Sequence, residues 1–282
     1  MKLSIVIITL NEEANIGRTL KSVAPLAAGG TGEIIILDSG STDCTCEIAR
    51  EFGARVYVEQ WKGFAAQKNS AIDKASGEWI LSLDADEELS DELLRELMRG
   101  SKTGPSYEWC LTLSPRGKLG APVGYYIPRR NLFLGRWIKH GGFYPDRKLR
   151  LFQRSAGRFE ERAVHETAKV NGAIGKLSGD LIHYAYPTLS GYIEHMNRYS
   201  SLGAELAVNK NQTSRSIFAF FWNVLLRPRL TFFYNYVLRL GFLDGREGFL
   251  LHLYHSAYVS WKYAKAWEKS RQQPRHGAAE KQ

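Results

Sequence analysis

The first hundred residues alternate between short apolar runs and amphipathic stretches. The apolar runs are rich in β-branched residues and predict strands at residues 3–9, 33–38, 55–58 and 78–83. The stretches between and after them predict helices at residues 11–23, 42–52, 64–75 and 90–98. Strands separated by helices are joined by right-handed crossovers, so we expect an α/β fold with a mostly parallel central sheet flanked by helices.

The pattern changes twice after this region. Between about residues 106 and 184, short strand-like runs are interrupted by glycine and proline. From residue 186 onward the chain is helical in pattern, aromatic and basic, and it ends in a polar tail from residue 270. We therefore expect an α/β domain over residues 1–190 and a helical region over residues 191–282.

Charge is distributed unevenly along the chain. The composition, 44% apolar and 24% charged, is that of a folded protein, and the net charge is +9. Residues 1–100 carry a net charge of −7, whereas residues 101–190 carry +9 and residues 191–282 carry +7. An acidic first third and a basic remainder indicate an anionic partner for the later part, and nucleic acid, an anionic membrane and a phosphorylated substrate all fit at this point.

The three cysteines, Cys44, Cys46 and Cys110, are too few for a disulfide scaffold, and no second Cys/His pair stands at zinc-ligand spacing. A reduced, structural role is favoured over a metal site, which indicates the cytosol. The apolar stretch at residues 3–10 lacks an export cleavage site. The apolar run at residues 217–226 is shorter than the roughly 20 residues that a membrane span requires.

Two aspartates, Asp84 and Asp86, directly follow the fourth predicted strand. Carboxylates two residues apart in a strand-end turn can reach one hard cation, and Mg²⁺ or Mn²⁺ then keeps other positions for phosphate oxygens and water. A solvated acidic turn before the next helix is equally consistent with the spacing. A phosphatase with Asp84 as nucleophile is a further alternative, although such enzymes usually carry the motif after their first strand.

Asp38 ends the second predicted strand and begins the turn Asp-Ser-Gly-Ser-Thr-Asp. Its carboxylate suits a ribose or a base edge, whereas helix capping by Ser41 or Thr42 requires no ligand. Lys68 lies near the start of the helix before the Asp-Ala-Asp strand, either beside a nucleotide or on the solvated surface. The chain contains neither G-x-G-x-x-G nor G-x-x-x-x-G-K-[ST], so no dinucleotide fingerprint or P-loop supports another nucleotide fold.

Taken in order, these motifs resemble the nucleotide-sugar motifs of family 2 glycosyltransferases with the GT-A fold. The resemblance covers about the first hundred residues and lies in Ser-Ile-Val-Ile-Ile-Thr-Leu-Asn-Glu-Glu at residues 4–13, Asp-Ser-Gly-Ser-Thr-Asp at 38–43, Lys-Asn-Ser-Ala at 68–71 and Leu-Asp-Ala-Asp at 83–86. Segments at residues 144–147, 150–152, 164–166 and 241–245 are similar to the subgroup that contains lipopolysaccharide inner-core β-glucosyltransferases. The resemblance implies a Rossmann-like GT-A sheet and an inverting, metal-dependent transfer from a nucleotide-diphosphate sugar, with a UDP-sugar favoured, to a lipid-anchored glycan such as a lipopolysaccharide core.

The same resemblance assigns the donor-binding residues. They are Thr9, Asn11, Glu13, Asp38, Ser41, Lys68 and Asp84, with Arg147 and Arg150 from the later basic segment. Asp86, with Asp84 behind it and His183 as a third ligand, is expected to hold Mg²⁺ or Mn²⁺ on the diphosphate; for His183, a place in the core is the alternative. A fixed cation there stabilises the leaving group more in the transition state than in the ground state.

The general base is where the chain departs from the family pattern. Many members carry a Glu-Asp pair that is absent here, and His165-Glu166 lies about where it would fall. Glu166 is therefore predicted to take the proton from the acceptor hydroxyl, with Asp146 as the second candidate. A salt bridge to Arg162 is the alternative role for Glu166.

The last third of the chain combines aromatic and apolar residues with lysine and arginine, in a pattern typical of helices that lie in a membrane interface. Packing on the catalytic domain, or a dimer contact, would leave the same pattern. We expect a peripheral protein on the cytoplasmic face of the cell membrane that meets a lipid-linked saccharide acceptor. A nucleic-acid- or membrane-binding protein without transferase activity is the alternative, but the acidic first hundred residues argue against a nucleic-acid partner.

Overall fold

The structure, a computed structural model, describes residues 2–30, 32–98, 121–160 and 167–272 of the 282-residue chain. Its contacts divide the chain into two compact units. Unit 1 comprises Met1–Asn131 and Pro145–Ala185, and unit 2 comprises Leu132–Tyr144 and Tyr186–Gln282.

The division differs from the single boundary near residue 190 that the sequence predicts. The chain crosses between the units at three places, because the segment Leu132–Tyr144 leaves unit 1 and returns to it. Phe133 and Ile138 of this segment pack in one apolar cluster with Tyr192 and Leu251 of the helical unit. Such long-range packing is not visible in the local pattern of the sequence.

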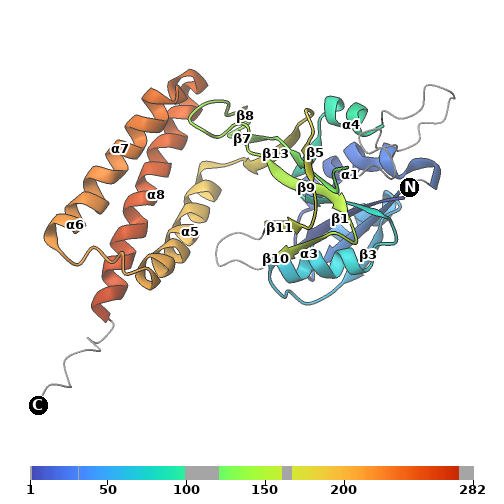
Figure 1. Cartoon of the computed structure of the whole chain (residues 1–282), viewed down its shortest axis with the longest axis horizontal. Coiled ribbons are helices and arrows are strands. Elements are labelled where there is room, and N and C mark those ends of the chain that lie inside the picture. The colour runs from blue at the N-terminus through green and yellow to red at the C-terminus, as the bar shows by residue number, and fades with distance from the viewer. Residues whose placement is uncertain (1, 31, 99–120, 161–166, 273–282) are drawn as a thin grey trace, which may run out of the picture. The chain divides into compact units, whose positions relative to one another are not determined.

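Unit 1 is built on a seven-stranded sheet with the strand order β12-β6-β9-β4-β1-β2-β3 (Figure 1). Its strands are β1 (Leu3–Thr9), β2 (Gly32–Asp38), β3 (Arg55–Val58), β4 (Trp79–Asp84), β6 (Gly124–Ile127), β9 (Lys148–Gln153) and β12 (Ile174–Lys176). Strands β4, β1, β2 and β3 run parallel, and β9 runs antiparallel to β4 and to β6. The mostly parallel α/β architecture is therefore confirmed.

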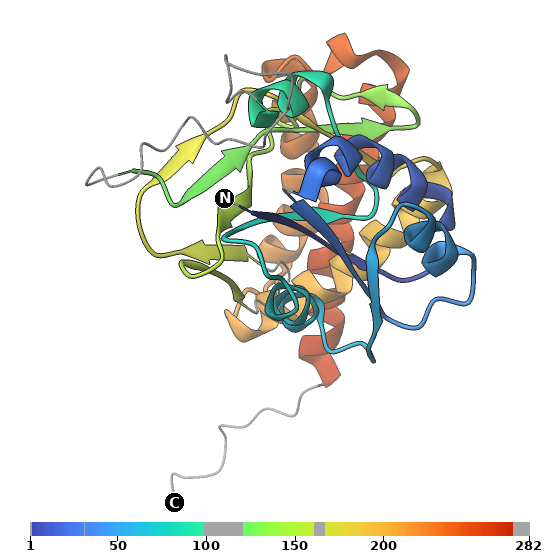
Figure 2. The same ribbon diagram turned by 90° about the vertical axis from the view of Figure 1, so that its right-hand side faces the viewer.

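Helices cover both faces of this sheet (Figure 2). They are α1 (Glu13–Ala27), α2 (Thr45–Glu51), α3 (Phe64–Asp73) and α4 (Asp91–Met98). Successive side chains of a strand point to opposite faces, so Ile5 packs in a cluster with Leu20 of α1, whereas Val6 packs in a second cluster with Ile72 of α3. Burial on both faces explains why β1 is a nearly continuous apolar run.

Shorter strands complete unit 1. Strand β5 (Glu87–Leu89) pairs antiparallel with β13 (Leu181–Tyr186), which places His183 opposite Glu87. Strands β10 (Gly157–Glu160) and β11 (Thr167–Val170) form a second antiparallel pair. Strand β7 (Arg129–Phe133) begins in unit 1 and carries two of the residues that matter below.

Two helices begin later than the sequence predicts. Helix α1 begins at Glu13 rather than at residue 11, because Asn11 has a φ of 54°, in the left-handed region that a right-handed helix does not contain. Helix α2 begins at Thr45 rather than at residue 42. The preceding turn ends there, since Asp43 Oδ1 accepts a hydrogen bond from the amide of Thr45 at 3.1 Å.

Unit 2 is mainly helical. Its elements are β8 (Arg136–Trp137), α5 (Leu189–Asn209), α6 (Ile217–Phe221), the π-helical turn η2 (Trp222–Leu226), α7 (Arg227–Phe233), the π-helical turn η3 (Tyr234–Leu238), the 3₁₀ turn η4 (Gly241–Asp244) and α8 (Gly245–Gln272). Within this unit α8 lies between α5 and α7 (Figure 1). In the part of the chain that the structure describes, no helix combines the length and the apolar character needed to cross a bilayer.

Candidate active site

Asp38, at the carboxyl end of β2, is buried and accepts four hydrogen bonds. Its Oδ2 accepts from Thr9 Oγ1 at 2.9 Å and from Ser41 Oγ at 2.5 Å, and its Oδ1 accepts from the amides of Gly40 and Ser41 at 2.9 and 2.8 Å. Burial alone would raise the pKa of Asp38, but these hydrogen bonds outweigh it and hold the pKa below its usual value. Asp38 therefore stays ionised and shapes the turn after β2, with Thr9 and Ser41 beside it.

The loop after β1 is joined to this turn by reciprocal hydrogen bonds. The amide of Asn11 donates to Ser41 Oγ at 2.8 Å, and the amide of Glu13 donates to Asp43 Oδ2 at 3.1 Å. In return, Glu13 Oε2 accepts from the amide of Cys44 at 3.0 Å. The structure thus brings together the predicted nucleoside-binding residues at the carboxyl ends of β1 and β2, where parallel sheets bind ligands.

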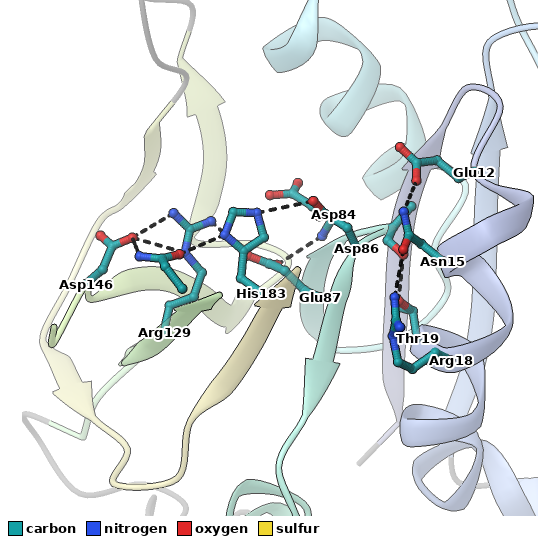
Figure 3. Close-up of polar contacts among 12 residues, drawn as sticks. Glu12, Asn15, Arg18, Thr19, Asp84, Asp86, Glu87, Arg129, Asp146 and His183 are labelled. Carbon is teal, nitrogen blue, oxygen red and sulfur yellow. Dashed lines mark hydrogen bonds and ion pairs between the residues drawn. The ribbon is translucent and has the colours of Figure 1, made fainter. Parts of the chain in front are cut away.

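Glu12, between these residues, points toward the aspartates of the Asp-Ala-Asp turn (Figure 3). Its Oε2 accepts from Asn15 Nδ2 at 2.9 Å. Burial raises the pKa of Glu12, the Asn15 hydrogen bond opposes this, and the negative charges of Asp86, Asp43 and Asp84 add to the rise. A cation near these carboxylates would relieve that repulsion.

A buried network of alternating charges lies behind the Asp-Ala-Asp turn. Asp84 Oδ1 lies 2.8 Å from Lys68 Nζ, and Asp84 Oδ2 accepts from Arg150 Nη2. The same Arg150 nitrogen donates to Glu87 Oε1 at 2.7 Å, and Glu87 Oε1 also accepts from Arg129 Nη1 at 3.1 Å. Lys68, Glu87 and Arg150 are only 2%, 0% and 5% exposed, so each of these charges depends on its partners.

The network fixes the protonation state of Asp84. Burial would raise the pKa of this carboxyl group, but Arg150 and Lys68 outweigh burial and hold the pKa well below its usual range. For Arg150, burial acts to lower the pKa, and the carboxylates of Asp84 and Glu87 raise it instead. Both oxygens of Asp84 are occupied by cationic groups, so Asp84 orients Lys68 and Arg150 in this arrangement.

Asp86 faces His183, with Oδ2 3.3 Å from Nε2 (Figure 3). The other ring nitrogen, Nδ1, lies 2.7 Å from Asn131 Oδ1. Asn131 Nδ2 donates to the carboxylate of Asp146 at 3.2 Å, which sets the orientation of the amide and leaves Oδ1 to accept from His183 Nδ1–H. In the neutral imidazole, Nε2 then presents a lone pair toward a carboxylate, an arrangement that a shared cation would stabilise.

The protein supplies few ligands for such a cation. Among the described residues, no cluster of three or more His, Cys, Asp and Glu side chains is arranged to hold a metal ion. One carboxylate and one imidazole would leave most coordination positions to water and to phosphate oxygens, which is how Mg²⁺ is usually bound at phosphate-transfer sites. The donor set of Asp86 and His183 fits a divalent cation of this kind.

Asp146 is held by cations and not free to act as a base. Arg129 donates to Asp146 Oδ2 from Nε at 3.0 Å and from Nη2 at 2.6 Å, and Lys148 Nζ lies 3.1 Å from Oδ1. Burial would raise the pKa of Asp146, but Arg129 and Lys148 outweigh it and lower the pKa to about 2. A general base works best with a pKa near the operating pH, so this geometry favours a positioning role for Asp146 through Asn131.

Two further predicted residues are placed differently. Arg147 is exposed, in contrast to the buried Arg150, whose charge is already compensated by carboxylates. Glu166, the predicted base, lies outside the described residues.

The structure gives Glu87, Arg129 and Asn131 roles at the site that the sequence does not predict. Glu87 lies next to the predicted aspartates, and its complete burial gives it a role that its neighbour Glu88 does not share. Arg129 and Asn131 occupy alternate positions of β7, so they share a face of the strand. Their partners are distant in the chain. Strand β7 begins with three consecutive polar residues, so its sequence has no alternation that would separate one face from the other.

Comparisons with known proteins identify the family of the chain. Residues 4–156 match glycosyl transferase family 2. The lipopolysaccharide core biosynthesis glycosyltransferase LpsC of Rhizobium meliloti (strain 1021) is 30% identical over 281 residues, covering 95% of this chain and 93% of its own. An uncharacterized glycosyltransferase of Rickettsia typhi is 30% identical over 88% of this chain and 81% of its own.

A solved structure shares the fold. The mannosyltransferase PcManGT from Pyrobaculum calidifontis, solved in complex with GDP-Man and Mn²⁺, has a TM-score of 0.53 and 16% identity, covering 95% of this chain and 88% of that one. The protein is thus a glycosyltransferase with a GT-A-like fold. The chain belongs to glycosyl transferase family 2, and this membership overturns the alternatives of a phosphatase and of a binding protein without transferase activity.

Proposed function

We propose that this glycosyltransferase transfers a sugar, with inversion, from a UDP-sugar to a lipid-linked glycan such as a lipopolysaccharide core, and that it requires Mg²⁺ or Mn²⁺. The observation that carries the proposal is the pair of Asp86 and His183, 3.3 Å apart and oriented by Asn131. Asp86 follows the end of β4, and His183 lies on β13. Both residues are beside the loops at the carboxyl ends of the parallel strands.

Asp86 and His183 are the proposed metal ligands, with Asp84 behind them. Carboxylate oxygen and imidazole nitrogen are both ligands that divalent first-row metals accept. A cation at this position would neutralise the charge that develops on the leaving diphosphate. Asp84 supports the site indirectly, because it holds Lys68 and Arg150 in place.

The two joined loops are the proposed binding site for the nucleoside. They contribute Thr9, Asn11, Glu13, Asp38 and Ser41. Asp38 is assigned to shaping the turn, because its oxygens are already engaged, while the exposed backbone and side chains around it meet the base and ribose. The exposed Arg147 is assigned to the diphosphate, since Arg150 is compensated by Asp84 and Glu87.

Glu166 remains the proposed general base, which removes the proton from the acceptor hydroxyl as that oxygen attacks the anomeric carbon from the face opposite the leaving group. Asp146 is assigned to positioning. Its pKa of about 2 makes it a weak proton acceptor, and it orients Asn131 and therefore His183.

The acceptor and the location are proposed from similarity to LpsC, whose name places it in lipopolysaccharide core biosynthesis. A lipid-anchored glycan is extended where its anchor lies, so the enzyme is proposed to work as a peripheral protein on the cytoplasmic face of the membrane. The cationic and aromatic helices of unit 2 support this location.

The direct experiment is a thermal-shift measurement of the full chain with UDP-, GDP-, ADP- and CMP-sugars, each with and without Mn²⁺. A ligand at 100 times its dissociation constant adds about 2.7 kcal/mol of stability. We expect a UDP-sugar to stabilise the protein in a Mn²⁺-dependent manner, and Asp86→Ala to lose that dependence.

Asp91→Ala is the matched control, because it removes the same charge from an exposed position in the first turn of α4. It should retain the full shift. A folded wild-type protein without any Mn²⁺-dependent shift, or an Asp86→Ala variant that shifts like wild type, would contradict the proposed donor site.

A further inference from the structure

The helical segment from Ile217 to Leu238 exposes an unusual number of apolar side chains. It runs without interruption through α6, η2, α7 and η3. Of the 22 large apolar residues that are exposed in the described part of the chain, 11 belong to this segment, and Phe218 reaches 85% exposure. Soluble proteins rarely expose contiguous apolar surface on this scale without a partner for it.

The exposed residues form one stripe. Two adjacent exposed positions recur every four residues, at 217–218, 221–222, 225–226, 229–230, 233–234 and 237–238. We call these twelve positions the 217–238 face; eleven are apolar or aromatic, and Arg229 is the exception. The positions between them are less exposed, apart from Arg227.

Two π-helical turns keep this stripe straight. An α-helix takes 3.6 residues per turn, so a four-residue repeat would drift around it. The π-helical turns η2 and η3 are wider, with hydrogen bonds from residue i to i+5, and they offset the drift of the α-helical turns. The backbone irregularity thus has a consequence on the surface, since it aligns the apolar side chains.

The opposite side of the segment packs on α8. Phe220 contacts Trp267 with ring centroids 5.1 Å apart, and Phe232 contacts Phe249 at 5.9 Å. Ser260 Oγ also donates to the carbonyl of Val224 at 2.8 Å. The 217–238 face is therefore the side turned away from α8.

The charge around this face indicates which kind of partner binds it. No aspartate or glutamate occurs from residue 206 to residue 243, whereas Lys210, Arg215, Arg227, Arg229 and Arg239 all lie there. A second copy of the chain seated symmetrically on this face would bring like charges together, because a two-fold contact places the same patch on both sides. An anionic lipid surface offers both an apolar layer and negative charge.

The same arginines exclude a spanning orientation. Arg227 and Arg229 stand in the middle of the segment, and a spanning helix would carry them to the centre of the hydrocarbon. A helix that lies in the plane of the membrane keeps them at the level of the lipid headgroups. Trp222 and Tyr234 on the face are side chains that favour this depth.

We infer that the 217–238 face is the membrane-binding surface of this enzyme, which lies flat in the interface of an anionic bilayer with its apolar side chains inserted among the lipids. The proposed function includes a lipid-linked acceptor, and binding to the membrane would bring the enzyme to that acceptor. The inference rests on the proposed function in this respect only. The contact itself depends only on residues of unit 2.

Vesicle flotation of the full chain tests this assignment. We expect wild type to bind vesicles of phosphatidylcholine mixed with phosphatidylglycerol more tightly than vesicles of phosphatidylcholine alone. The double variant Phe218→Asp, Trp222→Asp should bind the mixed vesicles about a hundredfold more weakly, because each inserted side chain is worth at least about tenfold. Arg229→Gln should lose about fivefold on mixed vesicles and nothing on neutral ones.

Val58→Asp is the matched control, because Val58 is 61% exposed but lies on β3 of unit 1. It should bind vesicles like wild type. Wild type that fails to bind mixed vesicles, or a double variant that binds them as well as wild type does, would overturn the inference. So would a wild-type dimer in lipid-free solution that the double variant dissociates while neither protein binds vesicles, since the face would then belong to a second copy.

The thermal shift with UDP-sugar and Mn²⁺ separates this inference from the proposed function. The double variant is expected to keep that shift, because Phe218 and Trp222 belong to unit 2 and the proposed donor residues to unit 1. Vesicle binding without any donor-dependent shift would count against the proposed function and leave the membrane surface supported.

Discussion

Two regions of the molecule differ from ordinary protein architecture in opposite ways: the charge network around Asp84 is buried, and the apolar 217–238 face is exposed. In unit 1, Lys68, Glu87 and Arg150 are at most 5% exposed although they are charged. In unit 2, Phe218 and Trp222 are 85% and 53% exposed although they are apolar. Charged residues are almost never fully buried unless paired, and apolar surface is rarely left open in one patch.

The two departures have different energetic consequences. A buried ion pair that loses one partner leaves an uncompensated charge, so the network is costly to disturb. An exposed apolar side chain contributes little to folding, so a contiguous patch of such side chains indicates a use outside the folded chain. Stability measurements are therefore expected to respond to changes in the network, and binding measurements to changes in the 217–238 face.

Glu87→Gln is expected to have the largest effect on stability. The substitution leaves Arg150 and Arg129 without their shared carboxylate, and it should lower the free energy of unfolding by about 3–5 kcal/mol. Urea denaturation at neutral pH measures this change. Glu92→Gln, at an exposed position of α4, is the control and should stay within about 0.5 kcal/mol of wild type. Equal stability of the two variants would show that the buried carboxylate of Glu87 contributes no more to folding than an exposed one.

Asn131→Leu is expected to weaken the proposed metal site with less effect on folding. It removes the acceptor that orients His183 Nδ1–H, and loss of such a supporting hydrogen bond typically costs about 10–100-fold in metal affinity. Titration of Mn²⁺ in the presence of a UDP-sugar gives the affinity. Asn209→Leu, at an exposed position of α5, makes the same change of residue type and should bind Mn²⁺ normally. An unchanged affinity for Asn131→Leu would show that the amide does not position the histidine.

Asp146 makes the stability of unit 1 sensitive to acid. Its pKa in the folded protein is about 2, below the usual value of 3.8, so its contribution is complete above about pH 4 and is lost as the pH falls toward 2. Asp146→Asn should therefore be less stable than wild type by about 2 kcal/mol at neutral pH. The difference, followed by urea denaturation, should shrink in acid; a difference that is independent of pH would mean that the charge of Asp146 is not its source.

Phe218→Ser is expected to have the smallest effect on folding. Since the side chain is 85% exposed, the free energy of unfolding should change by less than about 0.5 kcal/mol. The same variant should nevertheless bind anionic vesicles at least about tenfold more weakly. A large loss of stability would show that Phe218 packs in the core, and would contradict its assignment to an exposed apolar face.

The fold of unit 1 was predictable because its signals are local. The apolar runs of β1 to β4 and the helical patterns between them are readable within a few turns of the chain, and β3 was predicted at the residues that the structure gives it. The transfer of Leu132–Tyr144 to unit 2 was not predictable, because it depends on contacts of Phe133 and Ile138 with helices more than fifty residues away.

The candidate site was predictable only in part. The strand-end positions of Asp38, Asp84 and Asp86 follow from the order of strands and motifs, and the structure gathers them at one edge of the sheet. The partners that decide the roles of the site residues come from other parts of the chain. Arg150 donates a hydrogen bond to Asp84, and Asn131 orients His183, which faces Asp86. Such pairings depend on how distant strands meet, for which the local sequence has no signal.

Mn²⁺ binding followed by electron paramagnetic resonance measures whether Asp86 and His183 hold the cation. The titration uses the full chain with a UDP-sugar, as wild type, Asp86→Ala and His183→Ala. If Asp86 and His183 hold the cation on the donor diphosphate, wild type will bind Mn²⁺ and each variant will bind it at least about tenfold more weakly. Equal Mn²⁺ binding by all three proteins would show that Asp86 and His183 are not ligands of the cation.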